Sequence, residues 1–242
     1  MKRVNITIEQ KNYQTREEIR ALRTNLQFCG DDKRVILMTS CIPGEGKTFV
    51  SIELAKAIAD MGKTVILVDA DMRKSVMASR LKISEVDMGL SHFLSGQCTL
   101  AEAIVATNIP KMHLIMSGPL APNPTELLET KRFQGMIDSL RKVYDYIIID
   151  CPPLGLVIDA AIIAREADGA IMVLESSKTK YRLAQDVKSK LEITGIPILG
   201  VVLNKVERKK HKGYYSKYYG KNYKKKGYGE YYAADAQVKK EN

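Results

Sequence analysis

The chain has 242 residues, of which 45% are hydrophobic and 27% are charged, and its formal net charge is +10. This size and composition fit one large α/β domain with a buried core and a shorter polar segment. No run of about 18 uncharged apolar residues is present, so no membrane-spanning helix is predicted. The first residues, MKRVNITIEQK, lack the apolar stretch of a signal peptide, and the four cysteines lack metal-type or disulfide-framework spacing. We therefore expect a reduced, cytoplasmic protein.

The positive charge is concentrated at the C-terminal end. Residues 207–242 contain eleven Lys and Arg against four Asp and Glu, a net charge of +7, which leaves +3 for residues 1–206. A basic protein would ordinarily suggest a nucleic-acid partner. Here the main domain has an ordinary charge, so the basicity has to be explained within the last 36 residues.

The N-terminal 28 residues contain one predicted helix. Residues 1–14 are polar and weakly patterned, and we expect an extended arm. Thr15 can cap a helix and Glu18 stands three residues later, as in a capping box. The apolar stripe of this helix is Ile19, Leu22 and Leu26. Another face carries Glu17, Arg20 and Arg23, which can form intrahelical ion pairs in solvent.

Residues 34–48, RVILMTSCIPGEGKT, read as a buried strand that turns into a helix. Glycines in the turn let consecutive N–H groups point at phosphate oxygens, and the helix adds its positive N-terminal end. Lys47 can neutralise the β- and γ-phosphates, and the Thr48 hydroxyl can ligate Mg²⁺. The pattern G-x-x-x-x-G-K-[ST] has Cys41 in place of its first glycine, so this is a variant P-loop; a turn without a ligand is the less favoured alternative. The predicted nucleotide-binding residues are Pro43, Gly44, Glu45, Gly46, Lys47, Thr48 and Phe49.

Two further buried strands end in carboxylates. Val65–Val68 is followed by Asp69 and Asp71, and Ile147–Ile149 is followed by Asp150. In an open parallel sheet, residues at the carboxyl ends of strands line the ligand crevice. Asp150 matches the Walker B role of holding Mg²⁺ through water. The first two aspartates are natural partners for Mg²⁺ or a substrate proton, and helix capping is their alternative role.

The middle of the chain is less informative. LSHFLSG and TLAEAIV predict short helices that are separated near Gly96. In the stretch NPTELL, Asn123 can cap a helix, Pro124 suits the first helical position and Glu126 closes a capping box. Helix initiation alone explains this stretch, without a catalytic role.

Three more strands complete the predicted sheet. They are HLIMSG at 113–118, GAIMVLE at 169–175 and PILGVVLNK at 197–205, giving at least six strands separated by helical segments. This alternation predicts a doubly wound, mostly parallel α/β sheet. Asn204, at the end of the last strand, is placed either to bind a nucleotide base or to form a turn.

The C-terminal segment is rich in tyrosine, lysine and glycine. Eight of the twelve tyrosines lie there: Tyr214, Tyr215, Tyr218, Tyr219, Tyr223, Tyr228, Tyr231 and Tyr232. This part of the segment has no aliphatic residues to build a core, so it is expected to be disordered. Its aromatics and lysines suit either stacking on single-stranded nucleic acid or phosphorylation, and an attached ATP site favours phosphorylation.

Taken together, these motifs resemble the bacterial tyrosine kinases of capsule and exopolysaccharide assembly, in the form whose cytoplasmic kinase is separate from its membrane activator. The Walker A, A′ and B motifs are SCIPGEGKT, VILVDADMR and IIIDCPP, and the resemblance covers essentially the whole chain. The family motif E-x-x-R-x-x-R falls on Glu17, Arg20 and Arg23. Septum-positioning and plasmid-partitioning ATPases share these boxes but carry K-G-G-x-G-K-T, where this chain has Ile42 and then Pro43.

The resemblance implies an autophosphorylating protein-tyrosine kinase with ATP and Mg²⁺, built from a kinase domain at 15–206 and a substrate tail at 207–242. Its implied catalytic residues are Lys47, Asp69, Asp71 and Asp150, and its implied metal ligands are Thr48, Asp71 and Asp150. Asp69 is the first choice for the base, although the sequence leaves open which Walker A′ aspartate takes that role. The implied partners are neighbouring copies in a ring, a membrane polysaccharide co-polymerase that recruits the kinase to the inner membrane face, and a tyrosine phosphatase. No nucleic-acid partner is expected.

Overall fold

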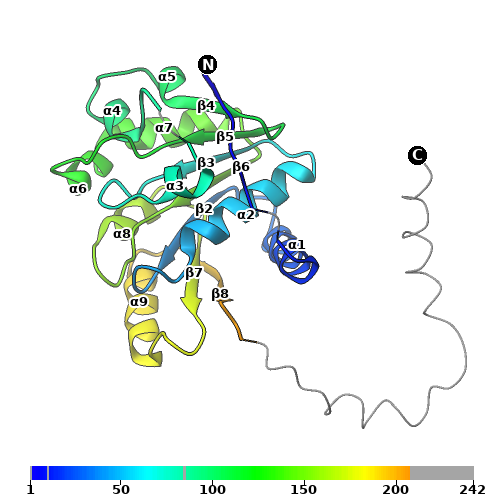
Figure 1. Ribbon diagram of the computed structural model, residues 1–242. Coiled ribbons are helices and arrows are strands. Elements are labelled where there is room, and N and C mark those ends of the chain that lie inside the picture. Colours follow the sequence, from blue (N-terminus) through cyan, green and yellow to red (C-terminus); the bar gives the residue numbers. More distant parts are fainter. Residues whose placement is uncertain (1, 10, 84–85, 208–242) are drawn as a thin grey trace, which may run out of the picture. The chain divides into compact units, whose positions relative to one another are not determined.

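A sheet of eight strands runs through the residues that the structure, a computed structural model, describes, namely 2–9, 11–83 and 86–207 (Figure 1). The spatial order of the strands is β1-β4-β5-β3-β6-β2-β7-β8. Their bounds are β1 (Lys2–Val4), β2 (Val35–Ser40), β3 (Val65–Asp69), β4 (Ile104–Thr107), β5 (Met112–Ile115), β6 (Tyr146–Asp150), β7 (Gly169–Glu175) and β8 (Ile198–Asn204).

Six of these strands are parallel, so their carboxyl ends meet at one edge of the sheet. The parallel pairs join β5 to β3, β3 to β6, β6 to β2, β2 to β7 and β7 to β8. Strand β4 runs antiparallel to β5, and β1 runs parallel to β4. The predicted mostly parallel sheet is confirmed, and all six predicted strands are present.

Helices cover both faces of the sheet. They are α1 (Tyr13–Phe28), α2 (Lys47–Asp60), α3 (Met77–Leu81), α4 (Leu90–Leu94), α5 (Leu100–Ala103), α6 (Pro124–Leu128), α7 (Lys131–Arg141), α8 (Asp159–Ala164) and α9 (Tyr181–Ile193). Successive strand residues point to opposite faces, so Val35 and Leu37 belong to one buried cluster and Ile36 and Met38 to the other. Helices α7, α8 and α9 cover the first cluster, and α1, α2 and α3 cover the second (Figure 1).

The N-terminal prediction was wrong in two details. Helix α1 begins at Tyr13, because Asn12 rather than Thr15 is its cap: the Asn12 Oδ1 accepts a hydrogen bond of 2.8 Å from the Thr15 N–H. Asn is among the preferred caps, and an N-cap binds the third helical N–H. Within the expected arm, Lys2–Val4 is extended but pairs with β4 as part of the sheet.

Two further local predictions also differ from the structure. The predicted helix TLAEAIV ends at Ala103, and the chain continues as strand β4 from Ile104. Asn123 occupies the cap position of α6, but its side-chain amide donates to the Glu126 carboxylate at 2.7 Å instead of capping the backbone. Pro124 is at the first helical position, as predicted.

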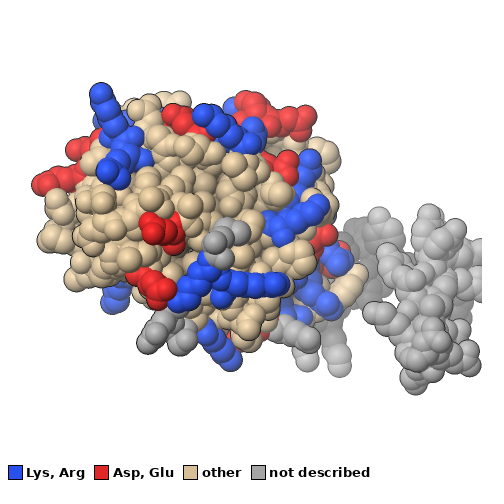
Figure 2. Space-filling model, turned by 90° about the horizontal axis from the view of Figure 1, so that it is seen from above, with Lys and Arg blue, Asp and Glu red and all other residues tan. Residues whose placement is uncertain are grey.

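Within the described residues, one compact unit extends to Val206. Lys and Arg are interspersed with Asp and Glu on the face shown in Figure 2, as expected for the small net charge of residues 1–206. No helix in the described ranges is long and apolar enough to cross a lipid bilayer. The eight C-terminal tyrosines lie outside the described residues, so their predicted role stays a prediction.

Candidate active site

A cavity of about 370 Å³ opens where the chain leaves strands β2, β3 and β6. The lining residues predicted from the sequence are Pro43, Gly44, Glu45, Gly46, Lys47, Thr48 and Asp71. Pro152, two residues after the Walker B aspartate, also lines it. The parallel sheet thus brings the three Walker segments to one crevice, as expected for the carboxyl edge of such a sheet.

The loop between β2 and α2 has the backbone of a phosphate-binding turn. Gly44 and Gly46 have φ angles of 87° and 94°, in the left-handed region that glycine adopts without a steric penalty. Among the described residues, no protein acceptor receives the backbone N–H groups of Gly44, Glu45, Gly46 or Lys47. Free donors at a helix N-terminus fit a bound polyphosphate, so the loop suits a nucleotide.

Lys47, Thr48 and Asp150 form one buried cluster. The Lys47 Nζ lies 2.8 Å from the Asp150 Oδ1, and the Thr48 Oγ1 donates to the Asp150 Oδ2 at 2.7 Å. Ser51, one helical turn after Lys47, also donates to Asp150 at 2.9 Å. Burial lowers the pKa of Lys47, but the Asp150 carboxylate more than offsets this and the pKa is raised, so the ammonium stays charged.

Asp69 is buried, with only 1% of its surface exposed, and it does not line the cavity. Its carboxylate accepts hydrogen bonds from the Ser75 hydroxyl and from the Asp71 N–H. Burial and the nearby Asp150 carboxylate raise the pKa of Asp69 to about 7. Asp71 lines the cavity, so only the second of the two Walker A′ aspartates is open to it.

Glu45 lines the cavity, but its carboxylate turns back and holds the loop together. The carboxylate accepts the N–H groups of Cys41 at 2.6 Å and Ile42 at 2.9 Å, and it binds the Thr179 hydroxyl after β7. The Cys41 side chain is buried; burial together with the Glu45 carboxylate raises its pKa to about 12, so the thiol stays protonated. A buried Cys therefore fits where the common pattern has glycine.

Asn204 has a role that neither of its two sequence-based readings included. Its side-chain Nδ2 donates to the Glu45 carbonyl at 2.8 Å, and a Cβ on Gly46 would lie 2.0 Å from that nitrogen. Lys205 donates to the Gly44 carbonyl at 2.6 Å and to Glu175 at 3.1 Å. The end of β8 therefore braces the P-loop through the backbone carbonyls of Gly44 and Glu45.

An ion pair between an exposed arginine and a buried aspartate ties the Walker A′ loop to two helices beyond it. The Arg73 guanidinium binds Asp159 at 2.7 and 2.9 Å, and it also donates to the Thr125 hydroxyl at 2.8 Å. Asp159 is fully buried at the start of α8, and Thr125 belongs to α6. The sequence shows no signal for this contact, because Arg73 and Asp159 are 86 positions apart.

The remaining predicted site residues lie away from the cavity. Phe49 does not line it, and the Lys11 ammonium stands over the Phe49 ring, 5.0 Å from its centre. Glu17 and Arg20 form an exposed intrahelical ion pair at 2.7 Å. Arg23 instead donates to the Ala57 carbonyl of α2 at 3.3 Å, so the three residues do not act as one solvated row.

Comparison with known proteins gives the family. A family model described as an AAA domain matches residues 33–187. Tyrosine-protein kinase CpsD of Streptococcus agalactiae is 42% identical over 192 residues, covering 79% of this chain and 83% of the relative. The crystal structure of the chimerical protein CapA2B2 superposes with a TM-score of 0.76 at 33% identity, covering 79% of this chain and 85% of that one. The chain belongs to the bacterial tyrosine-protein kinases.

The fold alone would not separate this family from its nearest rival. The cell division ATPase MinD of Pyrococcus furiosus superposes with a TM-score of 0.64 at 28% identity, covering 74% of each chain. The position of the rival family's second P-loop lysine is Ile42 in this kinase, and Ile42 carries no charge. The variant loop therefore supports the kinase assignment.

Sequence reasoning missed several cavity-lining residues. They are Ser40, Arg73, Lys74, Val76, Arg80, Pro153, Leu156 and Val157. Arg73 stands in the quoted Walker A′ motif, but without an assigned role. Ser40 and Pro153 likewise stand in the quoted Walker A and Walker B motifs, and Arg80 belongs to α3. The remaining four come from loops that tertiary packing brings to the cavity.

Proposed function

We propose that this kinase uses ATP and Mg²⁺ to phosphorylate the tyrosines of residues 207–242 on a neighbouring copy. The observation that carries the proposal is the P-loop with free N–H donors joined directly to the Lys47–Asp150–Thr48 cluster. The eight tyrosines begin ten residues after Asn204, which braces that same loop. A ring in which each tail enters the next active site is what the family resemblance implies.

The chain's own residues supply positioning and charge. The free N–H groups and Lys47 bind the phosphates and neutralise charge that develops on transfer, which is the main task in phosphoryl transfer. Thr48, Asp71 and Asp150 would provide oxygen atoms for Mg²⁺. Mg²⁺ usually keeps several waters and binds one or two carboxylates together with substrate phosphates, so phosphate oxygens and waters would supply its other ligands. Bound ATP·Mg²⁺ supplies the phosphoryl group and the metal's positive charge.

Asp69 is the proposed base. A tyrosine hydroxyl has a pKa of about 10, so its proton has to be accepted as the new bond forms. A base works best when its pKa is near the working pH, and the pKa of Asp69 is about 7. Ser75 covers this carboxylate in the structure, so the turn from Asp71 to Ser75 has to shift to admit the hydroxyl.

Replacement of Lys47 tests the assignment. Lys47→Met should abolish tyrosine phosphorylation, because phosphate neutralisation is lost. The protein should stay folded, because Asp150 keeps its hydrogen bonds from Thr48 and Ser51. Intact mass after incubation with Mg·ATP is the measurement. Lys56→Met, which removes a lysine from the outer part of the same helix, is the control and should gain phosphate normally. Phosphate incorporation by isolated Lys47→Met protein would show that the P-loop assignment is wrong.

A further inference from the structure

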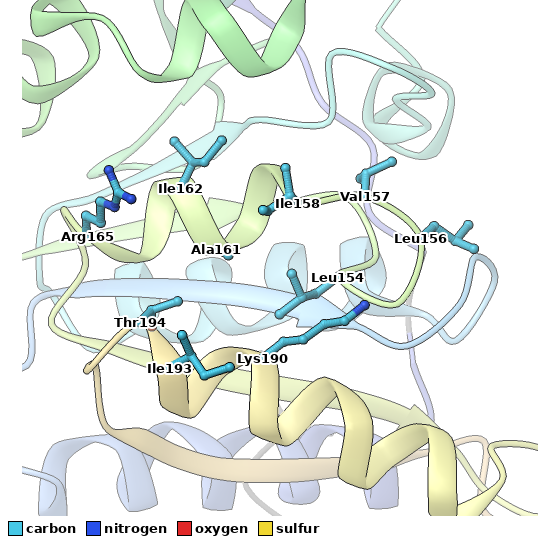
Figure 3. Close-up of a pocket in the computed structure, with 10 residues that line it drawn as sticks. All are labelled: Leu154, Leu156, Val157, Ile158, Ala161, Ile162, Arg165, Lys190, Ile193 and Thr194. Carbon is cyan, nitrogen blue, oxygen red and sulfur yellow. The ribbon is translucent and has the colours of Figure 1, made fainter.

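A second cavity, of about 540 Å³, lies between α8 and α9. Its walls are mostly apolar, and several of these side chains are open to solvent: Leu156 is 62% exposed, Ile158 61% and Ile193 86%. Figure 3 shows α8 and the loop before it on one side of this groove and α9 on the other. Clustered exposed apolar side chains next to a cavity are typical of a protein-binding surface.

The groove is continuous with the active site. Leu156 and Val157 line both the P-loop cavity and the groove. They lie at one end of the groove in Figure 3, and Arg165 lies at the other end. A polypeptide that presents a tyrosine to the P-loop can therefore extend directly into the groove.

The groove carries positive charge without a matching negative partner. Arg165 and Lys190 both line it. Within the described part of the chain, neither side chain forms an ion pair or a hydrogen bond. The segment that best complements this groove is therefore apolar and carries about two carboxylates, one for each cation, rather than basic side chains.

The C-terminal segment of the kinase contains one stretch with this chemistry. Residues 208–227 hold nine Lys and Arg and no Asp or Glu. Residues 228–238, YGEYYAADAQV, hold Glu230 and Asp235 and no Lys or Arg, and the remaining residues are mainly Tyr, Ala and Val. The charge changes sign within the segment, so only its second part suits the groove.

We propose that residues 228–238 of a second copy dock in the groove between α8 and α9, with Glu230 and Asp235 facing Lys190 and Arg165. This docking presents the five tyrosines from Tyr214 to Tyr223 to the P-loop. Tyr223 precedes Tyr228 by five residues, and an extended chain of that length spans roughly 17 Å. The inference rests on the proposed function, because it concerns the substrate segment of that same reaction.

The test is phosphorylation between two full-length forms of the chain. The acceptor carries Lys47→Met and cannot label itself. The donor has its eight C-terminal tyrosines replaced with Phe and carries Glu230→Lys and Asp235→Lys, so its own segment leaves the grooves free. Initial rates of phosphotyrosine formation are measured against acceptor concentration at saturating ATP, and against ATP concentration at a fixed, high acceptor concentration.

Ile193→Glu in the donor should raise the KM for the acceptor about tenfold and leave the KM for ATP unchanged, because an apolar contact that docking would bury becomes a charge. Tyr181→Glu is the matched control: Tyr181 is 77% exposed on the same helix but does not line the groove. Lys190→Glu in the donor should raise the KM similarly, and Glu230→Lys in the acceptor should restore much of the loss.

The outcomes separate the inference from the function. If the Lys47→Met acceptor gains no phosphate from a donor whose groove is intact, the proposed function itself is overturned. Labelling with the same KM for Ile193→Glu and Tyr181→Glu donors would overturn the docking inference alone. An Ile193→Glu donor with an unchanged KM and a smaller assembly would assign the groove to contacts between folded domains, and would also overturn it.

Discussion

Two buried carboxylates of the active site have opposite surroundings. Asp150 is paired with the Lys47 ammonium and accepts hydrogen bonds from the hydroxyl groups of Thr48 and Ser51. Asp69 accepts one hydrogen bond from the Ser75 hydroxyl and one from the Asp71 N–H, and it lies near the negative charge of Asp150. Their positions suit different tasks: Asp150 holds positive charge in place, and Asp69 exchanges a proton near neutral pH.

The raised pKa of Asp69 has a measurable effect on stability. With a pKa of about 7 when folded and the usual 3.8 when unfolded, Asp69 binds more protons in the folded state. The free energy of unfolding should therefore fall as the pH rises from about 4 to about 7. Between pH 5 and pH 8, metal- and nucleotide-free protein should lose about 1–3 kcal/mol more than the Asp69→Asn variant.

Urea unfolding of both proteins at several pH values measures this difference. Asp138→Asn, on the exposed side of α7, is the control and should follow the unmodified protein at every pH. Parallel curves for Asp69→Asn and the unmodified protein would mean that Asp69 titrates in its usual range, and would remove the argument for Asp69 as the base.

Single residues could be predicted where a local pattern defines their task. Lys47 and Thr48 follow from strand, turn and helix signals within a few positions of each other, and Asp150 follows from the apolar strand that it ends. The three do meet in one cluster. The pairing of Arg73 with Asp159, and of Asn204 with the Glu45 carbonyl, depends on how distant segments pack. No pattern in one sequence encodes such contacts, so the contacts were missed even where the residue itself, such as Asn204, was named as part of the site.

At the scale of elements, the buried central strands were the easiest to predict. Runs such as Ile147–Ile149 are apolar throughout because helices cover both faces of the sheet. The short strands β1 and β4 were missed, since three or four residues at one side of a sheet carry little periodic signal. Helix α1 was found, but its start was misplaced because Thr15 and Asn12 are both acceptable caps.

The P-loop is one element that depends on another for its shape. Asn204→Ala removes the hydrogen bond from β8 to the Glu45 carbonyl, a contact worth about 1 kcal/mol. We expect the affinity for an ATP analogue to fall about fivefold, because the loop loses its preset conformation. Isothermal titration with the ATP analogue and with inorganic triphosphate measures the effect, and Asn25→Ala on the exposed face of α1 is the control.

The two ligands distinguish the two roles of Asn204. If Asn204 only holds the loop in shape, its loss lowers the affinity for the ATP analogue and for triphosphate equally, since both ligands bind the same N–H groups. A contact with the nucleotide base would weaken only the ATP analogue, and that result would contradict the bracing role.

At the scale of the whole molecule, helix α1 carries the predicted contact between copies. Glu17 and Arg20 are exposed and bind only each other among the described residues, whereas Arg23 also holds α1 to α2. Changing Glu17, Arg20 and Arg23 together to Ala should give a folded monomer that binds ATP but barely labels its tail. The Glu17→Ala and Arg20→Ala double variant should do the same without the loss of the α1–α2 contact. If light scattering shows an intact assembly for both variants, these residues form a solvated helix face and do not contact another copy.

Phosphorylation should act on the assembly through charge. Residues 207–242 carry a net charge of +7, and each phosphotyrosine adds roughly −1.5 to −2 at neutral pH. About four phosphates would therefore cancel the charge of the segment, and further ones would invert it. A dianion also fits poorly in a cavity that Asp71 lines and next to which Asp69 and Asp150 are buried, so a phosphorylated tail should leave its neighbour's site.

If bound tails help to hold the copies together, the unphosphorylated protein and the Lys47→Met variant should assemble, whereas extensively phosphorylated protein should be monomeric. Replacement of the eight C-terminal tyrosines with Phe should keep the assembly intact even with ATP, because Phe can dock but cannot accept phosphate. Sedimentation of these proteins measures the change. A parallel assay with single-stranded DNA tests the other reading of the segment, which predicts salt-dependent binding that is lost with the segment and is indifferent to Lys47. Equal sedimentation before and after phosphorylation would show that charge on the segment does not control assembly.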